Sequence, residues 1–199
     1  MNFSSFLLLL ITFLLGSALF LSAGSAFGFF SDLSLAGPVK IEVVEFSGGD
    51  IYNDSTRFAE NTLILKHCGG NKLPLDSVSI QISGKGNAYS GIPGTDGKMH
   101  YGDVSVFYEH LNKSQKNSDF EKNNKGTLKD GFWTSGETFL LTGNDSLNST
   151  VSSVFVSVGE QTNTSNNYGF SSNQTLEIRI YQKNKAGKSQ LILKKEIDV

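Results

Sequence analysis

The residues with the clearest chemical potential are an adjacent histidine and cysteine, His67 and Cys68, in the run LILKHCGG (63–70). A thiolate beside an imidazole base is the arrangement of a nucleophilic enzyme. However, LILKHC alternates like a β-strand, and consecutive strand residues point to opposite faces of a sheet. The imidazole therefore cannot deprotonate the neighbouring thiol, and we interpret Cys68 as a small, half-buried strand residue.

Other residue types that support catalysis or metal binding form no recognisable site. The histidines are isolated from one another, and serine elbows, zincin motifs, phosphate loops and dinucleotide fingerprints do not occur. Asp50, Asn53 and Asp54 carry oxygen ligands for calcium, but an EF-hand loop requires an oxygen ligand where Tyr52 stands. We therefore predict no enzyme activity, no metal site and no cofactor.

Composition excludes further classes of function. The formal net charge is −2 and charged residues make up 18% of the chain, so a basic surface for nucleic acid is not available. A single cysteine excludes an intramolecular disulfide. A chain of 199 residues suits one domain with an appendage, and this domain must be stabilised by its apolar core.

The appendage is an apolar N-terminal segment. Residues 1–31 contain no ionisable side chain, and the first basic residue is Lys40. Such a run is long enough for a membrane helix. The alternative is a cleaved signal peptide ending at the small residues 24–26, but the apolar run continues to Phe30, which favours a retained helix. We predict a hydrophobic helix over 1–31 and an extracellular domain over 32–199.

Glycosylation motifs also point outside the cell. Asn-x-Ser/Thr sequences follow the apolar segment more often than chance predicts. Glycans would place the segments around them on the surface. The candidate acceptors are Asn53, Asn112, Asn144, Asn148, Asn163 and Asn173.

Beyond residue 38 the sequence alternates with period two, which is typical of half-buried β-strands. Short strands separated by Gly, Asn, Asp and Ser clusters predict an antiparallel β-sandwich. We expect an all-β head domain, immunoglobulin-like, of about eight strands. The predicted strands are 39–43, 62–68, 77–83, 103–108, 137–142, 153–158, 176–181 and 189–197.

Three connections are predicted. Gly69-Gly70 is expected to turn the strands of 63–84 into a hairpin, and Gly187 a second hairpin at the C-terminal end. Residues 109–131 are polar and lysine-rich, so we expect a long exposed loop that has room for no more than a frayed helical turn.

This layout resembles that of archaeal type IV pilins and archaellins. GFFSD (28–32) resembles the exit of the pilin helix, and LILKHCGG with LPLDSVSIQISG resembles a strand pair of the pilin head. FWTSGETFLL and the closing LEIRIYQKNKAGKSQLILKKEIDV are similar to later pilin elements. One departure is that no Lys or Arg precedes position 40, whereas pilin precursors carry a basic leader.

The resemblance implies a structural subunit that is anchored in the membrane and then assembles into an extracellular helical filament for surface adhesion or attachment. The partners would be identical copies, because an uncharged segment leaves the bilayer only for another apolar environment. Small residues would allow close helix approach. The predicted assembly residues are Phe6, Leu9, Phe13, Leu14, Gly16, Phe20, Phe27 and Phe30.

Two alternatives remain open. SAGSAFGFFSD (22–32) also resembles the signal-peptide junction of camelysin-like secreted fibre proteins. A membrane-anchored or secreted binding module of the cell envelope would instead recognise a sugar or a protein. Its contact residues would be the 109–131 loop or Trp133, although Trp133 is most simply a packing aromatic.

Overall fold

The computed structural model describes residues 37–49, 60–90, 97–113, 118–146, 154–164 and 167–199. The chain divides into two units, Met1–Gly37 and Pro38–Val199, and the second unit is the head domain. The predicted N-terminal helix, its assembly residues and the boundary after residue 31 lie outside the described residues. Among the described residues, no helix is long and apolar enough to cross a membrane.

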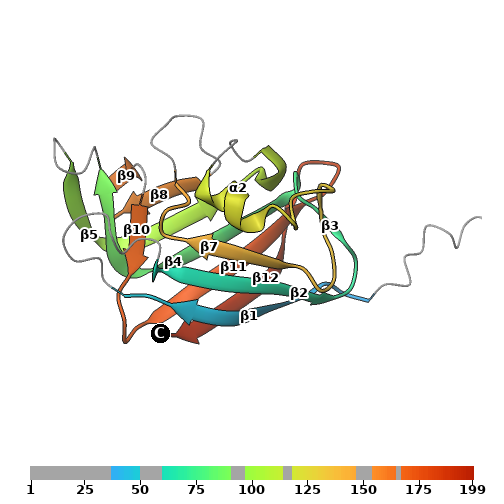
Figure 1. Ribbon diagram of the computed structural model, residues 1–199, viewed down its shortest axis with the longest axis horizontal. Coiled ribbons are helices and arrows are strands. Elements are labelled where there is room, and N and C mark those ends of the chain that lie inside the picture. Colours follow the sequence, from blue (N-terminus) through green and yellow to red (C-terminus); the bar gives the residue numbers. More distant parts are fainter. Residues whose placement is uncertain (1–36, 50–59, 91–96, 114–117, 147–153, 165–166) are drawn as a thin grey trace, which may run out of the picture. The chain divides into compact units, whose positions relative to one another are not determined.

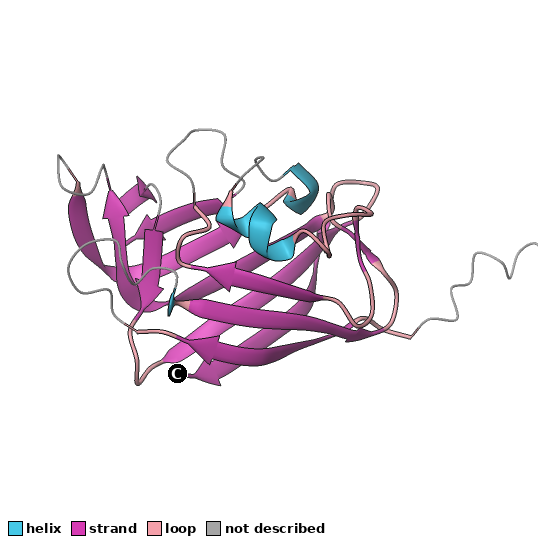
Figure 2. Ribbon diagram, viewed as in Figure 1, coloured by secondary structure: helices cyan, strands magenta, loops and turns pink. Residues whose placement is uncertain are grey.

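The described part of the head domain is built from antiparallel strands with the short α-helix α2 (Asp119–Asn124) and a 3-10 turn at Leu111–Lys113 (Figures 1 and 2). All eight predicted strands are present, so the antiparallel all-β prediction is confirmed. They are β1 (Lys40–Ser47), β2 (Thr62–Gly69), β4 (Val78–Ser90), β5 (Lys98–Tyr108), β7 (Thr138–Thr142), β8 (Val154–Val158), β11 (Thr175–Lys183) and β12 (Ser189–Asp198). The short strands β3 (Leu73–Pro74), β6 (Phe132–Trp133), β9 (Gln161–Thr164) and β10 (Asn167–Phe170) were not predicted.

The strands form two main sheets. The smaller sheet has the order β1-β2-β7, and the larger has the order β12-β11-β4-β5-β8-β9, with β10 pairing beside β11 on the long strand β4. β3 and β6 form a separate two-stranded ladder. The edge strands are therefore β1 and β7 in the smaller sheet and β12 and β9 in the larger sheet.

One apolar core lies between the two sheets. Alternate residues of the inner strands are buried in it, whereas β1 buries only Ile41 and β12 buries no residue fully. Full burial of one such side chain contributes roughly 1.5–3 kcal/mol. The small sheet supplies Ile41, Leu63, Leu65, Phe139 and Leu141, and the large sheet supplies Ile80, Ile82, Val104, Val106, Val156, Leu176, Ile178 and Ile180. The period-two pattern of the sequence thus indicates which side chains face the opposite sheet.

The hairpin predicted at Gly69-Gly70 is wrong. Strand β2 belongs to the small sheet and β4 to the large one, so the chain crosses from one sheet to the other. The crossing is anchored by Leu73 and Leu75, which are fully buried. Gly70 has a φ of 90°, and a Cβ at that position would collide with the Pro38 carbonyl. The glycines thus make a tight turn, as expected, but the strand after the turn pairs elsewhere.

The closing hairpin is confirmed. Strands β11 and β12 pair from Thr175 opposite Asp198 to Lys183 opposite Ser189, with one register shift between Ile180 and Tyr181. Asn184 forms the turn, since its Oδ1 accepts from the backbone N–H of Ala186 and of Lys188 at 2.9 and 3.0 Å.

The prediction of an exposed loop over 109–131 is wrong, although the helical turn that it allowed is present. Its described part contains helix α2 (Asp119–Asn124), whose N-cap Ser118 accepts a hydrogen bond from the Glu121 N–H at 3.0 Å. Phe120 is buried and stacks on Phe139 of β7, with ring centroids 5.8 Å apart. Leu111 is buried as well, and Leu128 packs against the core. Three apolar residues scattered over a polar stretch were too weak a signal for the sequence pattern.

Helix α2 closes the outer edge of β7 with side chains. The Asn124 amide donates to the Leu140 carbonyl at 2.8 Å and accepts from the Leu140 N–H at 2.7 Å, as a neighbouring strand would. Thr127 Oγ1 donates to the Thr138 carbonyl at 2.8 Å. An open strand edge invites pairing with another chain, and here it is blocked.

Candidate functional site

His67 and Cys68 lie on opposite faces of β2, as predicted. His67 is fully buried, and its Nε2 lies 3.0 Å from the Asn71 carbonyl oxygen, to which it must donate because a carbonyl only accepts. Its ring meets Trp133 edge-on at 5.8 Å. Cys68 points outward, and partial burial together with the Glu42 carboxylate raises the pKa of its thiol. The pair has no geometry for nucleophilic catalysis.

The interpretation of Trp133 as a packing aromatic is confirmed, and a sugar-binding platform there is excluded. The side chain has no exposed surface, and its Nε1 donates to the Glu137 carbonyl at 3.2 Å. Its ring meets Phe139 edge-on at a centroid distance of 4.8 Å. A buried ring cannot stack on a ligand.

The described residues hold no group of three or more His, Cys, Asp or Glu side chains that could bind a metal ion. The weak calcium candidates Asp50, Asn53 and Asp54 lie outside the described residues.

The glycosylation candidates differ in their surroundings. Asn112 and Asn173 are exposed, whereas Asn144 is half-buried. Ser146, the hydroxyl residue of the Asn144 motif, is buried and donates to the Val154 carbonyl at 3.3 Å. The Asn163 backbone belongs to β9, and Asn53 and Asn148 lie outside the described residues.

A buried polar cluster joins β5, β10 and the turn after β7. The Tyr108 hydroxyl donates to Asp145 Oδ2 at 2.9 Å and lies 2.6 Å from the Tyr168 hydroxyl. Asp145 also accepts from the backbone N–H and the hydroxyl of Thr142, at 2.7 and 2.8 Å. Burial raises the pKa of Asp145 to about 7, although these donors favour the carboxylate. The cluster is closed off from solvent, so its role is structural.

The outer face of the large sheet carries two ordered rows of side chains across five strands. Cross-strand pairing aligns the members of each row, and adjacent strands are about 4.8 Å apart. The first row is Glu196, Glu177, Ser83, Ser105 and Ser157, and the second is Lys194, Arg179, Gln81, Phe107 and Phe155.

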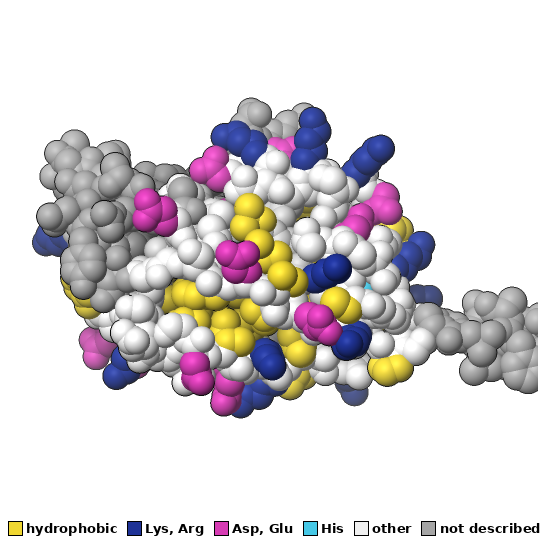
Figure 3. Space-filling model, turned by 60° about the horizontal axis from the view of Figure 1, so that its bottom comes forward, with side chains coloured by type: hydrophobic (Ala, Val, Ile, Leu, Met, Phe, Trp, Pro, Cys, Tyr) yellow, Lys and Arg dark blue, Asp and Glu magenta, His cyan; other side chains and the backbone are white. Residues whose placement is uncertain are grey.

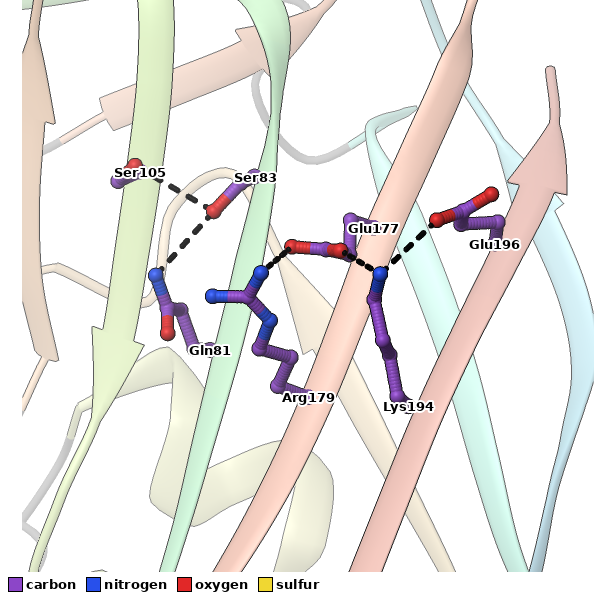
Figure 4. Close-up of polar contacts among 7 residues, drawn as sticks. All are labelled: Gln81, Ser83, Ser105, Glu177, Arg179, Lys194 and Glu196. Atoms are coloured by element: carbon purple, nitrogen blue, oxygen red, sulfur yellow. Dashed lines mark hydrogen bonds and ion pairs between the residues drawn. The ribbon is translucent and has the colours of Figure 1, made fainter. Parts of the chain in front are cut away.

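The β11 and β12 part of these rows is a chain of ion pairs, here termed the charged strip: Glu177, Arg179, Lys194 and Glu196 (Figure 4). Glu177 contacts Arg179 at 2.6 Å and Lys194 at 2.7 Å, and Lys194 contacts Glu196 at 3.1 Å. Lys194 lowers the pKa of Glu177, and Glu177 raises that of Lys194. Two cations and two anions leave the strip without net charge.

The β4, β5 and β8 part of the same rows is uncharged. Gln81 Nε2 donates to Ser83 Oγ at 3.3 Å, and Ser83 Oγ lies 3.4 Å from Ser105 Oγ (Figure 4). Phe107 and Phe155 are direct cross-strand partners, 36% and 42% exposed. We term these two residues the aromatic pair.

Sequence reasoning missed the aromatic pair, although its signal was present. In VSVFY (104–108) and VFVSV (154–158), each phenylalanine occupies a position on the same side of its strand as a serine. Residues on that side point to solvent and not to the core.

A surface of mixed polar and apolar character lies where the ends of β1 and β12 approach each other. A groove of about 440 Å³ opens there between the two sheets. Its lining residues are Val43, Val44, Glu45, Phe46, Ser47, Gly48, Ile197, Asp198 and Val199, here termed the open groove. Figure 3, which brings the lower side of Figure 1 forward, shows apolar side chains gathered on that side of the molecule.

Comparison of the chain with known protein families and with curated proteins found no match. The β-rich fold and the apolar N-terminal segment are therefore the observations from which a function can be proposed.

Proposed function

We propose that this chain is the structural subunit of an extracellular, type IV pilus-like filament that serves surface attachment. The observation that carries the proposal is the 31-residue segment without an ionisable side chain that precedes a β-rich head. Before assembly this segment would lie in the membrane as a helix, and in the filament it would pack against identical neighbours. In finer detail, we propose that the head is an immunoglobulin-like sandwich carried on that helix.

The head supports a structural role. Its core is apolar and continuous, its single cysteine points away from the core, and its buried polar cluster is enclosed. Of the two places expected to serve a binding module, Trp133 is buried and helix α2 packs on β7. A binding module is therefore not proposed as a second function.

Electron microscopy of extracellular material tests the proposal. Leu9→Glu or Leu14→Glu places a charge in the proposed filament core, and we expect filaments to disappear. The matched control is Leu191→Glu, because Leu191 lies on the head and is 47% exposed. Filaments that persist in the Leu9 and Leu14 variants would contradict the proposal.

Intact mass of the extracellular protein provides an independent test. A pilus-like subunit retains residues 6–30, so its mass corresponds to loss of a few residues or none. Cleavage after residue 26 would remove the assembly segment and favour the camelysin-like alternative.

A further inference from the structure

We propose that Asn173 carries an N-linked glycan whose first sugars lie in a polar groove on the outer face of the large sheet. The inference goes beyond filament assembly, since it requires only an exported head and the motif Asn173-Gln174-Thr175. The occupant of the groove is thus a carbohydrate attached to this same chain.

The groove lies beside the connection between β10 and β11. Its volume is about 610 Å³, and clefts that hold small molecules measure roughly 300–1,000 Å³. Its side chains on β4 and β5 lie on the outer face, because they alternate with the buried Ile82 and Val104. Asn173 is part of the wall, so a sugar on its amide begins at the groove. The lining residues, here termed the polar groove, are Ser83, Gly84, Lys85, Asp103, Val104, Ser105, Asn173, Gln174 and Thr175.

The attachment point is held against the sheet by hydrogen bonds. Asn173 has a φ of 61°, in the left-handed region that asparagine adopts more readily than most residues, and its N–H donates to the Val199 carbonyl. The Gln174 side chain binds both backbone groups of Lys85, accepting from the N–H at 2.6 Å and donating to the carbonyl. The first sugar would therefore leave the protein from a fixed place beside β4.

The motif is accessible in the folded head. Asn173 and Thr175 are both exposed. The Thr175 hydroxyl donates to the carboxylate of Asp198, which is exposed as well, at 2.9 Å. This surroundings differ from those of the Asn144 motif, whose hydroxyl residue is buried.

The lining of the polar groove matches the chemistry of a sugar. A pyranose ring carries hydroxyls that donate and accept hydrogen bonds, and the hydroxyls of Ser83 and Ser105 lie 3.4 Å apart on adjacent strands (Figure 4). Lys85 and Asp103 are cross-strand partners, and an ammonium and a carboxylate form strong hydrogen bonds with hydroxyls. One cation and one anion leave the groove without net charge, which suits an uncharged ligand.

The groove also gives the glycan a direction. From Asn173 it leads past Thr175 to the row that contains Ser83 and Ser105. The row of the aromatic pair follows two residues further along the strands, roughly 7 Å away. Sugar C–H groups pack against the electron-rich face of a phenyl ring. A longer glycan would therefore cover the aromatic pair.

Protection of Lys85 tests this seating. The full-length chain is purified from the medium of cells that add N-linked glycans, and glycopeptide mapping establishes which acceptors are occupied. We expect acetylation of Lys85, followed by mass spectrometry, to be severalfold faster in Asn173→Gln than in the parent. Acetylation of Lys188, exposed in the turn between β11 and β12, should not change. The matched control Asn112→Gln, at another exposed acceptor, should leave the rate at Lys85 unaltered.

Two outcomes of that experiment would overturn the inference. One is an Asn173 without glycan, and the other is a glycan that leaves the rate at Lys85 equal to that in Asn173→Gln. The result is obtained whether or not the chain forms filaments, so it is separate from the test of the proposed function.

A double-mutant cycle distinguishes seating in the groove from simple crowding near it. Ser83→Ala with Ser105→Ala removes two hydroxyls of the groove and leaves the motif intact. Thermal melting is measured with and without Asn173→Gln in both backgrounds. We expect the glycan to raise the melting temperature of the parent, and this increment to fall by at least about half in the serine variant. Equal increments in the two backgrounds would overturn the inference.

Discussion

The hydroxyl oxygens of Tyr108 and Tyr168 lie 2.6 Å apart inside the head, and the Tyr108 hydroxyl donates onward to Asp145. Burial, followed by the nearby Asp145 carboxylate, raises the pKa of both tyrosines, so each stays protonated. Three strands and a turn are held together by this short chain of hydrogen bonds.

The buried Asp145 carboxyl makes stability depend on pH. Its pKa rises from an ordinary 3.8 to about 7 on folding, so between these values the folded chain binds a proton that the unfolded chain has released. The contribution of this group to stability therefore falls as pH rises through that window, by up to roughly 4 kcal/mol. Urea denaturation at pH 4.5 and pH 8 measures this change.

Asp145→Asn isolates that group, because its amide has the shape of the protonated carboxyl. We expect the variant to match the parent at pH 4.5 and to exceed it in unfolding free energy at pH 8. A variant that is weaker than the parent at pH 8 would contradict this expectation, since it would show that the three donors outweigh burial.

Removing single hydroxyls tests the tyrosine pair. Tyr108→Phe deprives Asp145 of a donor and leaves the Tyr168 hydroxyl without its acceptor, so we expect a loss of about 1–3 kcal/mol. Tyr168→Phe removes only the end of the chain and should cost less. Chemical denaturation of both variants decides the order, and equal losses would contradict it.

The Asn124 amide can be tested as a substitute for a strand. Asn124→Ala removes its three hydrogen bonds, to the Phe120 carbonyl and to both backbone groups of Leu140, and we expect a loss of roughly 2–3 kcal/mol. Hydrogen exchange at the Leu140 amide should accelerate, and the opened edge should promote aggregation. Asn112→Ala, at an exposed position, is the control and should change neither property. An unchanged Leu140 exchange rate would contradict the role assigned to Asn124.

Accessibility predicts which acceptors are modified when glycans are added to the folded head. We expect occupancy at the exposed Asn112 and Asn173 and none at Asn144, whose motif hydroxyl on Ser146 is buried. Glycopeptide mapping measures the occupancy. Substantial modification of Asn144 would show that it is modified before folding or that this turn opens.

The eight main strands were predictable because most of them bury alternate residues, and a period of two is readable without knowledge of the partner strand. The edge strand β12, which has no buried residue, was predicted from the turn that precedes it. The short strands β9 and β10 read QTNT and NYGF, in which no such alternation is present. Pairing was less predictable than strand position. A Gly-Gly turn serves a hairpin and a crossing between sheets equally well, and only the burial of Leu73 and Leu75 distinguishes them.

The candidate surfaces also differ in how far the sequence could predict them. Phe107 and Phe155 occupy positions at which the alternating pattern expects polar, solvent-facing residues, so the exposed aromatic pair was predictable in principle. The open groove was not, because it depends on which strands end each sheet and on how far apart those ends lie. The covering of β7 depends on an asparagine whose amide imitates a backbone, and composition carries no sign of that.

The charged strip has a consequence for the environments in which the filament would hold together. Dissolved salt weakens attraction between exposed opposite charges, but the strip is neutral within each head, and the proposed filament core, residues 1–31, contains no ionisable side chain. Apolar contacts weaken on cooling and strengthen when excluded salts are added. A filament built on this head would therefore tolerate brine better than cold.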